Sequence, residues 1–548
     1  MKRTLTFLLL AILALGAMPA QAVEPADGVF GTARYVPSNA KGFLALRTDD
    51  EFLGSLEAVL TRAQALLSDL GMPDSETKNI RQVLAETLGA PSVGDIEAVL
   101  AWSGDTITVA FDRRTGQDVA EMMYVIPLVD RATAEQYVTS NFGSNISLLG
   151  TFGRFTVYES TTQRNFLLFA DDVMMNLVNI TADQMSVIAA GNYPLLSGEP
   201  AFTSAVSALP SESYSVGLWA SGEAFAGTEA APILGELTLA AGATQLDGST
   251  YAIDVAAIPL TPMLPPLTIN PDFAAHIPET MSAVIHGADL AALVNTALNL
   301  AEQSTGEPTR ATLAGGFALA GLDFSEFLSW IKGDFALVGR LDARSILPSL
   351  LGTPANFRGL PGAFDAALLI EAVNPARAQA FAATLSAIFR SSAAQGAEGL
   401  AVSDETINGI ALTVVTAEST LPNNVTLSLE FALGASDQVF ALGTAGAVRA
   451  VFSGGASVMQ NEVYSGAAGS WLPDPTTVWT LDGLTAANLG TFAYLTLTPV
   501  TADEPLPKAE QVSAVMNRFA AFVRHATLST SVSDAGAMLL RATITLGE

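Results

Sequence analysis

Three histidines are the residues best suited to acid–base or metal chemistry in this chain, which contains no cysteine. They are His276, His286 and His525. None of them has neighbours at the spacing of a catalytic triad or of a zinc site. His525 follows a predicted helix, where a positive charge interacts favourably with the helix C-terminus. We therefore predict no catalytic, cofactor-binding or metal-ligating residue among them.

Motifs for nucleophilic or phosphate chemistry are also missing from the sequence. It has no Gly-x-Ser-x-Gly nucleophile elbow and no His-Glu-x-x-His zinc motif. The glycine-rich stretches "SGGAS" and "GAAGSW" lack the lysine of a phosphate-binding loop. We therefore expect no cofactor and no enzymatic activity.

Two adjacent carboxylate pairs, Asp49-Asp50 and Asp171-Asp172, could bind Ca²⁺ together with backbone oxygens. Neither pair belongs to an Asp-x-Asp-x-Asp-Gly loop, so helix caps and solvent-facing turns are the expected role. The sequence alone leaves open whether any Asp/Glu pair binds Ca²⁺.

Three triplets match the glycosylation pattern Asn-x-Ser/Thr, and they begin at Asn145, Asn179 and Asn424. A pattern of three residues often occurs by chance. Whether any of these asparagines is modified stays open at this point.

The first 22 residues, "MKRTLTFLLLAILALGAMPAQA", have the layout of a secretory signal peptide: a basic start, an apolar stretch and a small-x-small ending. We predict cleavage near Ala22 and a periplasmic or extracellular location. No later stretch is long and apolar enough to span a membrane, so we expect no transmembrane segment in the mature chain.

Composition limits the partners and the source of stability. The formal net charge is −29, which argues against nucleic acid and anionic lipid headgroups. Half of the residues are hydrophobic and only 14% are charged, so the chain can bury a large core. Without cysteine, that core must supply the stability that disulfides give many secreted proteins.

The elements of the sequence occur twice in the same order. "YVPSNAKGFLAL" (35–46) is followed by a capped amphipathic helix, and "HIPETMSAVIHG" (276–287) is followed by another, with Asp289 as N-cap and Gly306 as stop. Five further segments match in order, including strands that run into helices opened by Asp130 or by Asn374 with Pro375. Each half closes on a predicted hairpin, at 237–258 and at 526–546.

These matches predict an α+β fold made of two tandem copies of one unit. In each copy we expect a largely antiparallel sheet covered on one face by amphipathic helices. The first copy spans residues 30–258 and the second 274–548, with a Pro-rich linker at 259–273. The helix predicted at 508–523 has no clear counterpart in the first copy. A single irregular α+β domain is the alternative.

The chain also resembles a known family. The secretory start, the Pro-led opening strand, the helix that leads to a Trp and a Gly-Asp turn, and the internal duplication are similar to a family of bacterial secreted proteins catalogued as domain of unknown function 3352. The resemblance covers most of the mature chain, through diffuse apolar patterns. It implies a fold and no activity.

Three functions remain as hypotheses. The first is a non-catalytic cell-envelope or extracellular protein that acts by protein interaction or self-assembly, with an envelope protein or itself as partner. The second is a periplasmic carrier of an apolar ligand such as a lipid or pigment. The third and weakest is a carboxylate-based hydrolase, because no two acids can be singled out and aromatic residues are only 7% of the chain.

Overall fold

The computed structural model of the 548-residue chain describes residues 28–69, 93–112, 121–162, 164–211, 213–228, 231–260, 265–341, 364–396, 399–420, 426–488 and 509–547. The predicted signal peptide, residues 1–22, and Asn424 lie outside these ranges. The chain divides into two compact units. The first is Met1–Pro262 with Ser533–Ala542, and the second is Met263–Val532 with Thr543–Glu548.

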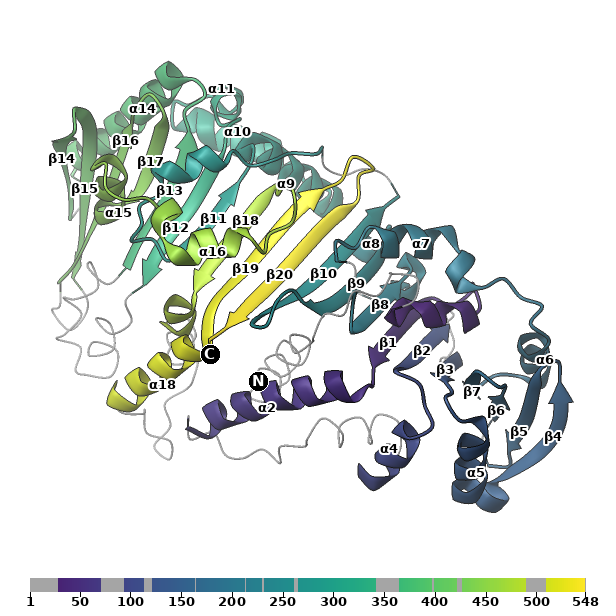
Figure 1. The fold of residues 1–548 in the computed structure, drawn as a ribbon. Helices are drawn as coiled ribbons and strands as arrows, with labels where there is room; N and C mark the ends of the chain where they lie inside the picture. The colour runs from purple at the N-terminus through teal and green to yellow at the C-terminus, as the bar shows by residue number, and fades with distance from the viewer. Residues whose placement is uncertain are drawn as a thin grey trace. The chain divides into compact units, whose positions relative to one another are not determined.

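The first unit contains an antiparallel sheet (Figure 1). Its strands pair in the order β4-β5-β6-β7-β3-β2-β1-β8-β9-β10. The strands are β1 (Gly42–Arg47), β2 (Thr106–Asp112), β3 (Glu121–Pro127), β4 (Ile146–Phe152), β5 (Phe155–Ser160), β6 (Asn165–Phe169), β7 (Val173–Val178), β8 (Val216–Ala220), β9 (Leu237–Gln245) and β10 (Thr250–Pro259).

The second unit has a sheet with the same order of pairing, β14-β15-β16-β17-β13-β12-β11-β18-β19, again antiparallel throughout. The strands are β11 (Ala283–Gly287), β12 (Phe335–Leu341), β13 (Phe364–Glu371), β14 (Leu400–Ile407), β15 (Ile410–Thr420), β16 (Thr426–Ala435), β17 (Val439–Thr444), β18 (Thr477–Asp482) and β19 (Val523–Val532). Strand β20 (Met538–Leu546) contributes Met538–Ala542 to the first unit and its other residues to the second.

Helices lie between these strands along the chain. In the first unit they are η1 (Val29–Tyr35), α2 (Asp50–Asp69), α4 (Val93–Leu100), α5 (Arg131–Phe142), η2 (Gly143–Asn145), α6 (Ala182–Ala190), η3 (Leu196–Gly198), α7 (Pro200–Ser207), η4 (Gly222–Phe225) and α8 (Ala231–Leu234). In the second they are η5 (Pro271–His276), α9 (Leu290–Thr305), α10 (Thr309–Leu319), α11 (Phe324–Trp330), α14 (Pro375–Ala394), α15 (Ala445–Phe452), η7 (Val458–Gln460), α16 (Glu462–Ala468) and α18 (Ala509–Phe522). None of the described helices is long and apolar enough to cross a membrane.

Local capping signals place several helix ends where the sequence predicts them. The carboxylates of Asp130 and Asp289 accept hydrogen bonds from backbone amides in the first turns of α5 and α9. Asn374 caps α14, and Gly306 ends α9 in the left-handed conformation, with φ of 70°. Within the segment predicted as a linker, Asn270 caps η5, and this 3₁₀ helix begins at Pro271.

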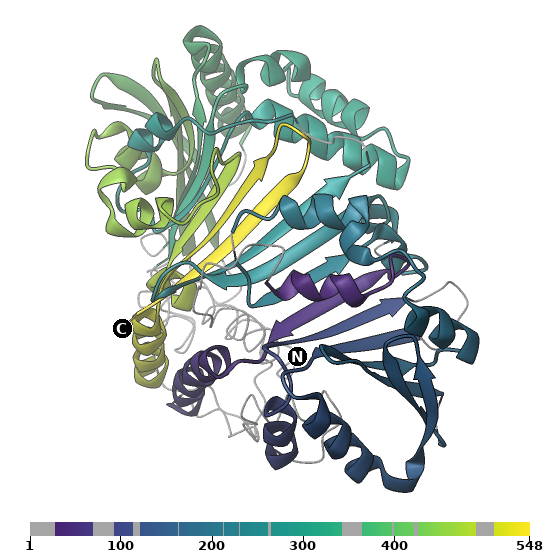
Figure 2. The same ribbon diagram turned by 45° about the vertical axis from the view of Figure 1, so that its right-hand side comes forward.

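The expectation that helices cover one face of each sheet is wrong. In β6, Leu168 belongs to one core cluster while Leu167 belongs to another that contains α5 residues. In β13, Leu369 packs with α15 and η5, whereas Ile370 packs with α11 and α14. Neighbouring side chains of a strand point to opposite faces, so helices pack on both faces of each sheet. Figure 2 shows α11 and α14 on the opposite side of the second sheet from α15 and α16.

Candidate functional site

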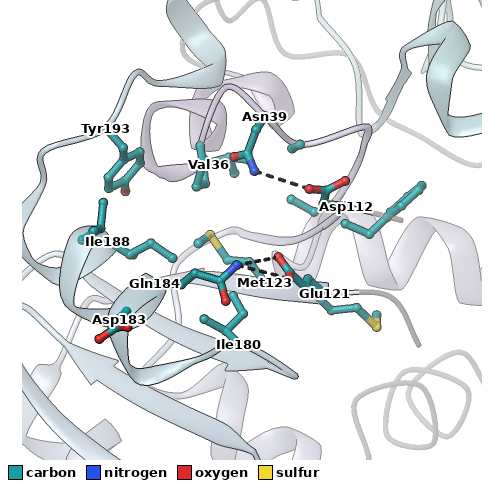
Figure 3. Close-up of a pocket in the computed structure, with 16 residues that line it drawn as sticks. Val36, Asn39, Asp112, Glu121, Met123, Ile180, Asp183, Gln184, Ile188 and Tyr193 are labelled. Carbon is teal, nitrogen blue, oxygen red and sulfur yellow. Dashed lines mark hydrogen bonds between the residues drawn. The ribbon is translucent and has the colours of Figure 1, made fainter. Parts of the chain in front are cut away.

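A pocket lies beside α6, and we call it the α6 pocket (Figure 3). It has a volume of about 380 Å³, within the range of roughly 300–1,000 Å³ that is typical of small-molecule sites. Its walls come from α6, from the neighbouring ends of β2 and β3, and from the segment before β1. Apolar side chains line most of it, including Val36, Met123, Ile180 and Ile188.

Polar groups stand around the apolar walls of the α6 pocket. The amide of Gln184 donates to both carboxylate oxygens of Glu121, at 3.2 and 3.1 Å. The side-chain amide of Asn39 donates to Asp112 at 3.4 Å (Figure 3). Asp183 adds a third carboxylate, and the described lining contains no lysine or arginine. This arrangement disfavours a negatively charged ligand.

A buried histidine–carboxylate pair lies in the second unit, outside the α6 pocket. His286 is fully buried, and its Nε2 lies 2.8 Å from Oδ2 of Asp334. The other ring nitrogen lies 3.3 Å from the hydroxyl of Tyr464. The backbone amide of Asn270 also donates to Asp334, so this carboxylate joins β11 to the chain that leads into η5.

His286, Asp334 and Tyr464 are residue types that acid–base sites use. His286 is fully buried, however, so a substrate cannot reach it. Burial, and then the charge of Asp334, raise the pKa of the Tyr464 hydroxyl, which keeps it protonated. Phe273 packs beside the His286 ring in a tilted arrangement, with a centroid separation of 5.5 Å. The geometry fits a hydrogen-bonded core histidine. Asp334 was missed in the sequence because a Gly-Asp turn explains an aspartate at this position without any further role.

Neither of the other two histidines hydrogen-bonds to Asp334 in the described residues, although the ring of His276 also packs against Phe273, with a centroid separation of 5.8 Å. His276 is half-buried at the end of η5, and burial lowers its pKa even though the charge of Glu371 acts in the opposite direction. His525 is buried at the start of β19, with Nε2 3.0 Å from Oγ1 of Thr545. The structure therefore does not bring the three histidines together as one site.

The first carboxylate pair caps a helix. Asp49 accepts hydrogen bonds from the Phe52 amide at 3.0 Å and from the Arg47 guanidinium at 2.6 and 2.9 Å. Burial alone would raise the pKa of Asp49, but these hydrogen bonds from Arg47 and Phe52 lower it below its usual value. Asp50 begins α2. The predicted cap is confirmed.

The second pair forms ion pairs at the β6–β7 turn. Asp171 binds Arg131 at 2.7 Å, and Asp172 binds Arg154 at 2.9 Å and the Tyr35 hydroxyl at 3.0 Å. Within the described residues, no group of three or more His, Asp or Glu side chains could hold a metal ion. Neither pair therefore forms part of a larger metal cluster in the described part of the chain.

The glycosylation triplets occupy different settings. Asn145 is exposed at the end of η2. Asn179 follows β7 in the left-handed conformation, with φ of 61°, and its backbone amide donates to the carbonyl oxygen of Arg164.

One buried ion pair has no counterpart in the sequence predictions. Arg541 binds Asp254 inside the first unit, with Nε to Oδ1 at 2.7 Å and Nη2 to Oδ2 at 2.9 Å. Tyr214 and Ser211 also donate to Asp254, at 2.8 and 2.6 Å. The sequence offered one signal for this pair, a single charged residue within each of two apolar strands: Asp254 in "YAIDVAAI" and Arg541 in "MLLRATIT".

Comparison of the chain with protein-family models, with curated proteins and with solved structures finds no match.

Proposed function

We propose that this chain is a secreted, non-catalytic protein of the cell envelope that acts by protein interaction or self-assembly. The observation that carries this proposal is a row of apolar side chains left open to solvent on corresponding strands of the two sheets. Leu44 and Leu218, which pair across β1 and β8, are 42% and 41% exposed. Leu337 and Trp479, which flank Ile285 on β12 and β18, are each 48% exposed.

Apolar side chains that adjoin one another on a surface favour contact with another protein, because burying them removes apolar area from water. Within each row the exposed side chains adjoin partly buried ones, so they belong to a continuous line of cross-strand neighbours. In the first unit the row is Leu218, Leu44, Val109 and Tyr124, and in the second it is Trp479, Ile285, Leu337 and Leu368.

We also propose that the two units are tandem copies of one ancestral unit, as the repeated sequence pattern predicts. The identical order of strand pairing supports this. So do two isolated bridges, Pro37 with Leu195 and Pro278 with Ser457, which follow η1 and η5. Corresponding aromatic pairs add to the support: Trp102 packs against Tyr137 of α5, and Trp330 packs against Phe381 at the same position of α14. Membership in the secreted family of unknown function belongs to the same proposal.

Sedimentation velocity of the mature protein over a range of concentrations tests the proposed association. We expect reversible dimers or larger species for the wild type, and loss of association in the double variant Leu337→Ser/Trp479→Ser. Leu319→Ser is the matched control, because Leu319 is 93% exposed on α10 and lies outside the rows. A protein that remains monomeric at every concentration and retains no envelope partner would contradict the proposal.

The α6 pocket supports a second candidate, carriage of a small apolar ligand. Its mostly apolar walls and its volume suit such a ligand, and its acidic surroundings favour a neutral or cationic one. Mass spectrometry of an organic extract from native protein tests this candidate. A stoichiometric compound that is absent from the filled variant Ile188→Trp supports carriage, and an extract without one rules it out.

A further inference from the structure

The second unit contains a groove between α14 and the sheet, and we call it the α14 groove. Its volume is about 1130 Å³. One side is the α14 face formed by Gln379, Ala382, Ala383, Ser386, Ala387 and Arg390. The other side is formed by β15, β16 and the adjoining turns, with Thr413, Leu433 and Ala435 among the lining residues.

In the first unit, larger side chains occupy the positions that correspond to the lining of the α14 groove. Following the strand pairs from Leu44 leads through Val109, Tyr124, Asn176 and Leu167 to Tyr158. Following them from Ile285 leads through Leu337, Leu368, Leu442 and Leu433 to Thr413. Tyr158 and Thr413 therefore occupy corresponding positions in the two sheets.

At two further positions the first unit also has a larger side chain than the second. Phe169 and Ala435 correspond, because each lies two residues beyond the row, at Leu167 and at Leu433. Val138 and Ala382 correspond on the helices, each eight residues after the N-cap, Asp130 or Asn374. Large side chains at three positions of the first unit thus correspond to smaller ones in the second. The smaller residues, Thr413, Ala435 and Ala382, all line the α14 groove.

The side chains at these positions of the first unit indicate what kind of group would fit the α14 groove. Tyr158 and Phe169 pack edge to face with a centroid separation of 6.0 Å. The Tyr158 hydroxyl donates to Oε1 of Glu135 at 2.6 Å. Gln379 stands at the position of Glu135, on the wall of the groove, so a hydrogen-bonding group is present at the same place.

Several polar side chains at the floor and edge of the α14 groove already bind one another or the backbone. The hydroxyl of Ser386 lies 2.8 Å from both Oγ1 of Thr413 and the carbonyl oxygen of Ala382. The charged side chains near the groove, Arg390 and Asp404, form an ion pair with each other. Gln379 donates to Asp437 at 3.1 Å through Nε2, which leaves the amide oxygen side for a ligand hydroxyl.

We propose that the α14 groove binds a small apolar compound with a phenolic ring, whose ring takes the place of Tyr158 and Phe169 and whose hydroxyl donates to Gln379. This inference goes beyond the functions proposed above, since it requires neither association nor the α6 pocket.

Titration calorimetry of the full mature protein with 1-naphthol tests the inference. We expect saturable binding at one site, and at least a tenfold loss of affinity in Thr413→Tyr/Ala435→Phe, which restores the side chains of the first unit. Ala387→Phe provides a second blocked groove, because Ala387 is an exposed helix position at which a large side chain does not disturb the core.

Two controls locate the binding. Ala380→Phe makes the same change on an exposed α14 position outside the groove lining, and Ile188→Trp fills the α6 pocket. Both should bind 1-naphthol as the wild type does. The proposal is overturned if the wild type shows no saturable binding, if binding survives in both blocked variants, or if dodecanoic acid binds in the groove and 1-naphthol does not.

Discussion

Arg541 binds both carboxylate oxygens of Asp254, a residue 287 positions earlier in the chain, within the core of the first unit. Asp254 is fully buried and Arg541 nearly so. Nη2 of Arg541 also donates to Ser211 at 2.7 Å. The C-terminal segment Ser533–Ala542 is therefore fixed to the first unit by a charge pair whose other hydrogen-bonding partners are also satisfied.

Removing one partner of this pair should destabilise the first unit strongly. Arg541→Ala leaves the carboxylate of Asp254 buried without its charge partner, which typically costs about 3–5 kcal/mol. Urea unfolding followed by circular dichroism should show the unfolding transition of the first unit move to lower urea. The exposed pair Arg524–Glu462 is the control, since Arg524→Ala should change stability by less than about 0.5 kcal/mol. Equal effects of the two variants would contradict the role given to Arg541.

The histidine cluster should behave as a structural element. Asp334→Ala removes the acceptor for the fully buried His286 and for the Asn270 amide, and a buried group such as His286 left unsatisfied costs about 1–3 kcal/mol. We expect a clear loss of stability of the second unit, measured by thermal unfolding. Asp404→Ala, at an exposed carboxylate, is the control. A variant Asp334→Ala with unchanged stability would show that the buried pair is not needed for the fold.

Tyr158 should make stability sensitive to alkaline pH. Burial, followed by its hydrogen bond to Glu135, raises the pKa of Tyr158 to about 12 from the usual 10.0. Because the folded-state pKa is the higher one, this contribution is complete below pH 10 and is lost as pH rises through about 12. Tyr158→Phe should therefore show a shallower fall in urea midpoint over this range than the wild type. An unchanged or steeper fall would contradict the assignment.

The local elements of the fold could be predicted from the sequence because their signals are short-range. Capping groups such as Asp130, Asp289 and Asn374 bind amides within one turn of their own helix. The tandem pattern also predicted hairpins at the ends of both halves, and the structure places β9 with β10 and β19 before β20 there.

Long-range features could not be obtained in this way. The partner of Asp254 lies 287 residues away, and nothing near Asp254 in the sequence identifies Arg541. The second helix layer was missed because strands such as β6 are apolar at successive positions, which indicates burial on both faces without naming what covers them. The α6 pocket and the α14 groove depend on which side chains meet across strands, so a one-residue change in register would remove them.

The most direct test of the proposed function places a photo-crosslinking amino acid, p-benzoylphenylalanine, at position 479 in cells that secrete the protein. The proposal predicts a crosslinked species of higher mass at position 479 and also at position 337, and none at position 319, where a more exposed side chain lies outside the rows. Absence of any crosslinked species at 479 and 337, in protein shown to be folded and secreted, would contradict the proposal that these apolar rows bind a partner.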